Sequence, residues 1–262
     1  AFHDRLKKHR SLKVFMDICV RCGACADKCQ FFLGTNDPKN MPVLRVELLR
    51  SLYRRDYTML GKLLGKTIGA RKLDYSVIKE LFYYAYQCTE CRRCSLFCPY
   101  GIDTAEITAL VREMLHELGL GIHWIMDPVK NCAFTGNHLG IKPHSYKEIV
   151  EMLADDCEYV TGIRPKTPFN ERGHEILFIC PSGDVFADPG IYTFMGYLIL
   201  FNELDLDYTL STYASEGGNF GSFVSFNMAK KLNAKMYEEA ERLGVKWILG
   251  GECGHMWRVV NQ

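Results

Sequence analysis

Two cysteine runs with identical spacing constrain this chain more than any other feature. Each run follows the pattern C-x2-C-x2-C-x3-C, and together they use eight of the twelve cysteines. The first run is Cys19, Cys22, Cys25 and Cys29, and the second is Cys88, Cys91, Cys94 and Cys98. Because such short spacers make neighbouring thiols converge, the fold must present two cysteine-rich loops to a group that binds sulfur.

That spacing is typical of [4Fe–4S] ferredoxins with two clusters, in which the last cysteine of each run binds the other cluster. Three sulfurs come from one tight loop and the fourth comes from elsewhere. We therefore predict two [4Fe–4S] clusters, bound through iron by the eight cysteines. Cluster A would be bound by Cys19, Cys22, Cys25 and Cys98, and cluster B by Cys29, Cys88, Cys91 and Cys94. The crossing would join two remote segments of the chain.

Residues in and beside the runs favour iron–sulfur ligation over the alternatives. Gly23 lies inside the first run, where a missing Cβ lets the backbone approach the cube. Pro99 follows the second run as in ferredoxins, although Gln30 follows the first. A structural zinc-binding scaffold is an alternative of another class, but a third cysteine at the same spacing is surplus to a tetrahedral zinc site. Disulfides fit poorly, because a chain of this length can bury a core without them.

Composition and charge set broader limits. A chain of 262 residues, 48% of them hydrophobic, is expected to form one or two globular domains. No stretch reaches the ~18 consecutive apolar residues of a transmembrane segment, and the net charge of +1 gives no reason to expect a nucleic-acid partner. Residues 1–130 carry 21 basic and 14 acidic residues, whereas residues 131–262 carry 11 and 17. The basic half is expected to have an ordinary solvated surface, with a face that docks near anionic lipid or an acidic partner as the alternative.

Residues 1–122 are predicted to form an α-helical ferredoxin domain. Apolar residues recur at helical spacing after Pro42, and residues 75–86 are a second helix candidate. Asp103 can cap a third helix that reaches about Leu118. The glycine-punctuated segment 62–72 is expected to be a connector. Residues 123–172, with four prolines, are expected to be a surface connector in which Cys132 and Cys157 are free thiols.

Residues 173–262 show a different pattern, in which apolar runs at 175–180, 206–210 and 245–249 alternate with helical patterns at 191–201 and 223–243. Such alternation predicts a parallel sheet. Ligands of these sheets collect at the carboxyl ends of the strands, where Cys180 and Cys253 lie. With His255, which could lower a thiol pKa, they are the weak catalytic candidates. Buried structural thiols are the alternative. The expected fold class is α+β multidomain, a helical ferredoxin domain followed by an α/β domain.

The segments FFLGT at 31–35 and DPKNMPVLR at 37–45, with the first cysteine run, resemble the iron–sulfur proteins of the heterodisulfide reductase D-like family. The likeness is closest to the DsrK branch and its archaeal Hme counterpart. It implies an oxidoreductase subunit, cytoplasmic and peripheral on the inner face of the cell membrane. Electrons would come from a quinol and a DsrM-like cytochrome b subunit, with other complex subunits as further partners. They would pass through the two clusters to a disulfide or trisulfide, which for the DsrK branch is a DsrC-like sulfur carrier protein in dissimilatory sulfur metabolism.

The resemblance also implies that residues 173–262 are a degenerate CCG-type repeat. Cys180 and Cys253 match the first and fourth cysteines of such a repeat, whereas Glu216, Gly217 and Met256 replace the others. A full repeat binds a noncubane [4Fe–4S] cluster. We therefore expect either a truncated chain or a catalytic half that lies outside this sequence, in which such a cluster and the complete catalytic centre would be found. Iron–sulfur subunits of flavin-linked glycolate, lactate and glycerol-3-phosphate dehydrogenases combine the same parts and are the nearest alternative.

Overall fold

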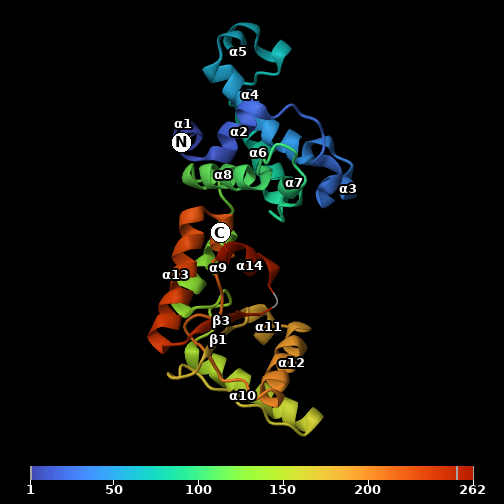
Figure 1. Cartoon of the computed structure of the whole chain (residues 1–262). Helices are drawn as coiled ribbons and strands as arrows, with labels where there is room; N and C mark the ends of the chain where they lie inside the picture. The colour runs from blue at the N-terminus through green and yellow to red at the C-terminus, as the bar shows by residue number, and fades with distance from the viewer. Residues whose placement is uncertain (1, 252, 262) are drawn as a thin grey trace. The chain divides into compact units, whose positions relative to one another are not determined.

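The computed structural model describes residues 2–251 and 253–261, and the chain divides into two compact units, Ala1–Gly121 and Ile122–Gln262 (Figure 1). Among the described residues, every helix is too short or too polar to cross a membrane.

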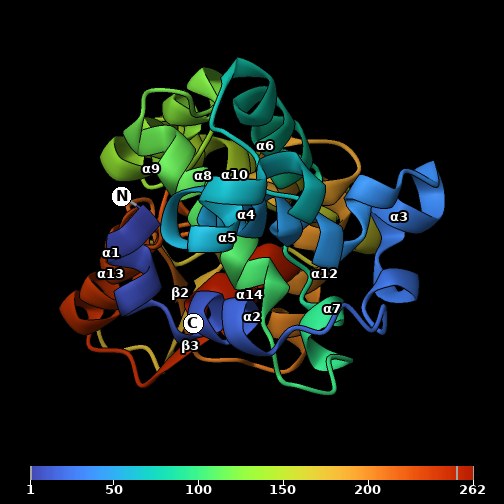
Figure 2. The ribbon, with the colours of Figure 1, turned by 90° about the horizontal axis from the view of Figure 1, so that it is seen from above.

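The described part of the first unit consists of helices and the loops between them. Its α-helices are α1 (Phe2–Lys8), α2 (Arg10–Ile18), α3 (Gln30–Thr35), α4 (Pro42–Tyr57), α5 (Met59–Leu64), α6 (Tyr75–Gln87), α7 (Arg93–Leu96) and α8 (Thr104–Glu117). Its 3-10 helices are η1 (Ala26–Lys28), η2 (Pro38–Asn40) and η3 (Gly65–Ile68). Helices α2, α4 and α6 pack against α8, whose Ile107 and Leu110 are fully buried. Helices α1 and α3 lie on opposite sides of α4 in both views (Figures 1 and 2).

The three helices predicted between and after the cysteine runs are confirmed as α4, α6 and α8. Pro42 occupies the first turn of α4, where a missing N–H costs nothing. The Asp103 side chain accepts hydrogen bonds from the amides of Ala105 and Glu106, both at 3.0 Å, and so caps α8. The predicted connector 62–72 is wrong in part, because α5 and η3 continue the chain as helical turns. Glycines 65 and 69 end these turns rather than prevent them.

The second unit is a three-layer α/β arrangement. Its helices are η4 (His123–Ile125), α9 (Met126–Thr135), α10 (Pro143–Thr161), α11 (Ser182–Phe186), α12 (Gly190–Glu203), η5 (Gly221–Phe223), α13 (Phe226–Leu243) and α14 (Gly254–Val260). The strands β1 (Ile176–Ile179), β2 (Tyr208–Leu210) and β3 (Trp247–Gly250) form a parallel sheet in the order β2-β1-β3. The parallel sheet is thus confirmed, although the strands begin one or two residues later than the apolar runs.

Alternate side chains of β1 anchor the two helical layers. Phe178 packs with α10, α11 and α12 on one face of the sheet. Leu177 and Ile179 pack with α13 and α14 on the other. Because side chains alternate along a strand, a four-residue strand can supply both cores when both faces are covered.

The surface connector predicted for residues 123–172 is wrong. Most of it forms α9 and α10, and both belong to the second unit. Pro143 stands in the first turn of α10 and therefore begins a helix instead of breaking one. Tyr146, Val150 and Leu153 recur at helical spacing along α10 and are buried against the sheet.

Candidate iron–sulfur cluster sites

A cavity in the first unit is lined by the four cysteines predicted to bind cluster A. Cys19, Cys22 and Cys25 come from the loop between α2 and η1, and Cys98 follows α7. Gly23 has φ +82° at the turn of this loop, a conformation that disfavours any side chain. Burial raises the pKa of Cys25 to about 11, so its thiolate needs a bound metal at neutral pH.

A second cavity is lined by the four cysteines predicted to bind cluster B, Cys29, Cys88, Cys91 and Cys94. Hydrogen bonds reach these sulfurs, among them those of Cys88 and Cys94. The Glu90 amide donates to Cys88 Sγ over 3.3 Å, and Thr104 Oγ1 donates to Cys94 Sγ over 2.9 Å. Donors of this kind stabilise the reduced form of an iron–sulfur cluster and raise its potential.

The lining of the two cavities is compatible with the crossed arrangement. Cys98 lines the cavity of the first run, and Cys29 lines the cavity of the second. Cys94 lines both cavities, so the two candidate sites adjoin. Which cluster each thiol binds therefore stays a prediction.

The thiols surround cavities instead of converging on one point. In the described part of the chain, no three Cys, His, Asp or Glu side chains gather closely enough to hold one metal ion. A zinc site needs its thiolates at about 2.3 Å from a single ion. Four thiols around a cavity suit a cluster of several metal atoms.

Arg45 supplies an independent sign that the second cavity receives an anion. It lines this cavity, is 5% exposed, and donates to the carbonyl and side-chain oxygens of Asn40. Its Nε is buried without a hydrogen-bond partner, and no carboxylate pairs with it among the described residues. Burial raises the pKa of Cys88, and the charge of Arg45 opposes that effect. Because an isolated buried guanidinium is costly, an anionic thiolate-bound cluster would complete the site.

We expect the substitution Arg45→Leu to make one of the two cluster midpoint potentials more negative by roughly 50–100 mV, because it removes a nearby positive charge that stabilises the reduced cluster. A redox titration followed by EPR measures both potentials. Arg45→Lys, which keeps the charge, and Arg10→Leu at an exposed position are the controls. Two unchanged potentials in Arg45→Leu would contradict the assignment.

A buried ion pair supports the second cysteine loop. Arg112 and Glu90 are 2% and 3% exposed, and their side chains meet at 2.6 Å. Arg112 Nη2 also donates to the Ala85 carbonyl over 2.9 Å and to the Cys88 carbonyl. Because these carbonyls end α6, the guanidinium fixes the point where the chain enters the loop. Arg50 acts similarly on the first loop, donating to the Cys19 carbonyl over 3.2 Å.

Sequence reasoning missed these three arginines, although a signal was present. Arg112 lies between Thr108 and Leu115 on the buried stripe of α8, and Arg45 lies among apolar residues of α4. A charge on an apolar stripe needs a specific partner, and that partner can be a cofactor.

The second unit places its candidate residues near the carboxyl edge of the sheet. Cys180 is buried directly after β1, and Gly251 approaches so closely that an added Cβ would lie 3.4 Å from Cys180 Sγ. Cys253 Sγ accepts from the Met256 amide over 3.4 Å and caps α14. His255 is exposed on α14. A catalytic role for Cys180, Cys253 or His255 stays a prediction.

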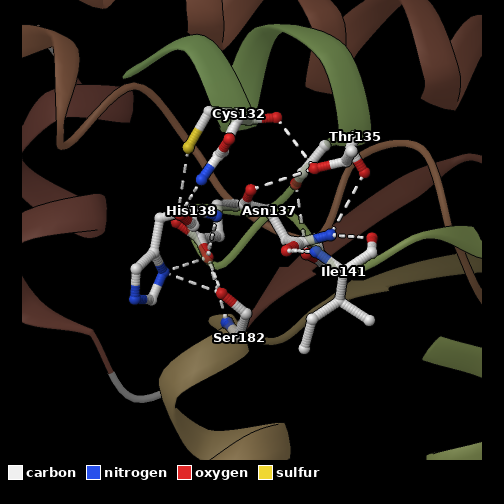
Figure 3. Close-up of polar contacts among 10 residues, drawn as sticks. Cys132, Thr135, Asn137, His138, Ile141 and Ser182 are labelled. Atoms are coloured by element: carbon white, nitrogen blue, oxygen red, sulfur yellow. Dashed lines mark hydrogen bonds and ion pairs between the residues drawn. The ribbon is translucent and has the colours of Figure 1, made fainter. Parts of the chain in front are cut away.

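Glu216, at a position where the resemblance expects a cysteine, is buried and contacts His138, Ser182 and Cys132. Figure 3 labels these three partners among the residues of this polar network. Its carboxylate accepts from the His138 ring over 2.6 Å and from the backbone and hydroxyl of Ser182. Although burial raises the pKa of Glu216, the His138 and Ser182 hydrogen bonds outweigh it and lower the pKa below its usual value. The same ring nitrogen, Nδ1, faces both Ser182 and Glu216, which is not the geometry of a hydrolase triad.

Cys132 and Cys157 are free thiols, as predicted, and both are buried. Cys132 donates to Glu216 Oε2 over 3.7 Å, and burial together with the Glu216 charge raises its pKa. Cys157 is fully buried in α10, and burial raises its pKa as well. Such thiols are unreactive packing residues.

Comparisons with known proteins identify similar iron–sulfur proteins. Residues 15–102 match the family model of a 4Fe-4S dicluster domain. The chain is 55% identical, over its whole length and 48% of the relative, to the Hdr-like menaquinol oxidoreductase iron-sulfur subunit 2 of Archaeoglobus fulgidus. It is 54% identical, with the same coverage, to the corresponding iron-sulfur subunit of Archaeoglobus profundus. Over 40% of the chain and 25% of the relative, it is 29% identical to the D-type subunit of the dihydromethanophenazine:CoB–CoM heterodisulfide reductase of Methanosarcina barkeri.

The chain spans about half the length of the curated relatives it matches most extensively. No solved structure matches it.

Proposed function

We propose, from the premise that close homologues of this chain are iron–sulfur subunits of Hdr-like menaquinol oxidoreductases, that it transfers electrons from a quinol towards a sulfur substrate. The observation that carries the proposal is the gathering of eight cysteines around two adjoining cavities, with buried Arg45 beside the second. The presence of a dicluster domain supports two [4Fe–4S] clusters as the carriers.

The clusters would supply one-electron redox chemistry, and the chain's own residues would set its conditions. Gly23 lets the first loop turn, while Arg50 and Arg112 hold the ends of the two loops. Thr104 and the Glu90 amide donate to cysteine sulfurs and favour the reduced state. Since Cys94 lines both cavities, the two clusters would be neighbours.

The donor is proposed to be a quinol, acting through a membrane cytochrome b subunit that resembles DsrM. Oxidation of the quinol releases two electrons and two protons. The acceptor is proposed to be a disulfide, whose S–S bond takes up two electrons and two protons to give two thiols, or a trisulfide, in which cleavage of one S–S bond by two electrons and two protons gives a thiol and a persulfide. Two one-electron carriers suit this two-electron exchange. The names of the relatives support a quinol donor and a heterodisulfide acceptor, whereas a DsrC-like carrier and dissimilatory sulfur metabolism are our finer proposal.

The acceptor site is proposed to lie largely in sequence that the longer relatives have in addition. In the second unit of this chain, Glu216 and its hydrogen bonds occupy a position where a complete CCG repeat has a cysteine. We therefore propose that a noncubane cluster, if the assembled protein has one, is held outside residues 1–262. The whole assembly would be peripheral on the inner face of the membrane, with other complex subunits.

We expect a menaquinol analogue to reduce both clusters in the assembled complex, and an added disulfide substrate to reoxidise them. Anaerobic EPR follows each step. The same complex carrying Cys22→Ala and Cys91→Ala, one change in each loop, should pass no electrons. Reduction by glycolate, lactate or glycerol 3-phosphate through a flavin subunit, with no response to quinol, would overturn the proposal in favour of the flavin-linked dehydrogenases. The Hdr-like relatives favour the first outcome.

A further inference from the structure

The first unit carries an apolar projection, formed by α5 and η3 and extending beyond the body of its other helices (Figure 1). We call residues 57–68 the apolar knob. Four of its apolar side chains are strongly exposed: Met59 88%, Leu60 63%, Leu63 82% and Leu64 46%. Single exposed leucines are common, but a contiguous group on one short helix marks a contact surface.

The knob is built to keep its leucines outside. Gly61 is buried against the end of α4, and an added Cβ there would lie 1.8 Å from the Arg54 carbonyl oxygen. Thr58 caps the helix by accepting from the Gly61 amide over 3.0 Å. An ordinary surface helix buries its leucines and exposes its small or polar residues. Here glycine faces inward and leucine faces outward, so the exposure is fixed by the fold.

Cations surround this apolar tip. Residues 54–73 contain six lysines and arginines and a single acidic residue, Asp56. Lys62 and Lys66 lie on the knob and are exposed, and Lys72 is exposed just after it. Arg55 donates to the Lys62 carbonyl over 3.1 Å and so ties this positive charge to the base of the knob.

We propose that the apolar knob inserts into the interfacial region of a membrane rich in anionic lipid. Apolar side chains beside lysines match a layer in which acyl chains lie beneath negatively charged headgroups. A second copy of the chain fits less well, because two knobs of this charge repel each other. The helix has six residues, so it lies in the interface and does not span the bilayer. The inference rests on the proposed function and adds a lipid contact to it.

The test uses the full chain with its clusters, sedimented anaerobically with vesicles of phosphatidylcholine alone or with about one third phosphatidylglycerol. We expect at least tenfold stronger binding to the anionic vesicles. The double substitution Met59→Gln and Leu63→Gln should weaken that binding roughly tenfold or more, because both side chains already face solvent and lose only lipid burial. Lys62→Gln with Lys66→Gln should abolish the preference for anionic vesicles.

Matched controls lie in the second unit. Phe134→Gln removes an equally exposed apolar side chain, and Lys230→Gln with Lys231→Gln removes two exposed charges. Both should bind vesicles like the unaltered chain. Failure of the unaltered chain to bind, or equal binding by the Met59 and Leu63 variant, would overturn the proposal. So would a concentration-dependent dimer that this variant abolishes.

The outcome is separable from that of the proposed function. Dithionite reduction of the clusters in solution does not involve the knob and should be the same in every variant. If vesicles are not bound but quinol still reduces the clusters in the complex, only the lipid contact is wrong. If the clusters do not respond to quinol while vesicles are bound, the proposed function fails instead.

Discussion

Alanine at both Cys22 and Cys98 should leave about four of about eight iron atoms bound to the chain, whereas alanine at both Cys22 and Cys29 should leave almost none. In the crossed arrangement Cys22 and Cys98 bind the same cluster, so the second substitution adds little to the first. Cys22 and Cys29 bind different clusters, although they belong to the same run.

The cavities motivate this expectation, because Cys98 lines the cavity of the first loop and Cys29 lines that of the second. Iron and acid-labile sulfide analysis measures the result. Alanine is chosen because a serine oxygen could still bind iron. Cys157→Ala is the control, since this fully buried thiol lies outside both runs and its loss should leave the iron content unchanged.

The opposite result would identify an uncrossed arrangement. If each run bound its own cluster, the Cys22 and Cys29 double variant would retain half of the iron, and the Cys22 and Cys98 double variant would lose all of it. Loss of all iron in both double variants would show that the two clusters depend on each other for assembly, and would contradict independent binding.

Arg112→Leu should destabilise the first unit by about 3–5 kcal/mol and lower the iron content, because it leaves the Glu90 carboxylate buried without its cation. The guanidinium also holds the carbonyls of Ala85 and Cys88, so the second loop loses its support. The melting temperature of the anaerobic protein and its iron content measure the two effects.

A second substitution separates charge from packing. Glu90→Gln in the Arg112→Leu background should recover part of the lost stability, since it removes the stranded negative charge. Arg10→Leu removes an exposed arginine of the same unit and should change the melting temperature little. A fully stable, fully loaded Arg112→Leu protein would show that the ion pair does not support the loop.

The helical half of the fold was predictable where local signals were strong. Pro42 and Asp103 mark helix starts by chemistry that acts within one turn, and the structure confirms both. In α10 the prolines around the helix suggested a connector, while the helical spacing of Tyr146, Val150 and Leu153 carried the correct information.

The site was only partly predictable. The cysteine spacing predicts the cofactor, because ligand geometry is encoded over a few residues. The supporting contacts are not encoded this way. Glu90 and Arg112 are far apart in sequence, and Glu216 meets His138 across 78 positions. The packing of α8 against α6 brings the first pair together, and the contact of the segment after β2 with the end of α9 brings the second pair together.

The central claim is that this chain binds two [4Fe–4S] clusters. It is tested most directly by measuring the iron, acid-labile sulfide and zinc content of the anaerobically isolated chain, together with its EPR spectrum after reduction. Two [4Fe–4S] clusters predict about eight iron and about eight sulfide per chain, with signals of reduced clusters. A colourless protein with about two zinc ions per chain, no sulfide and no EPR signal would contradict the account at its base.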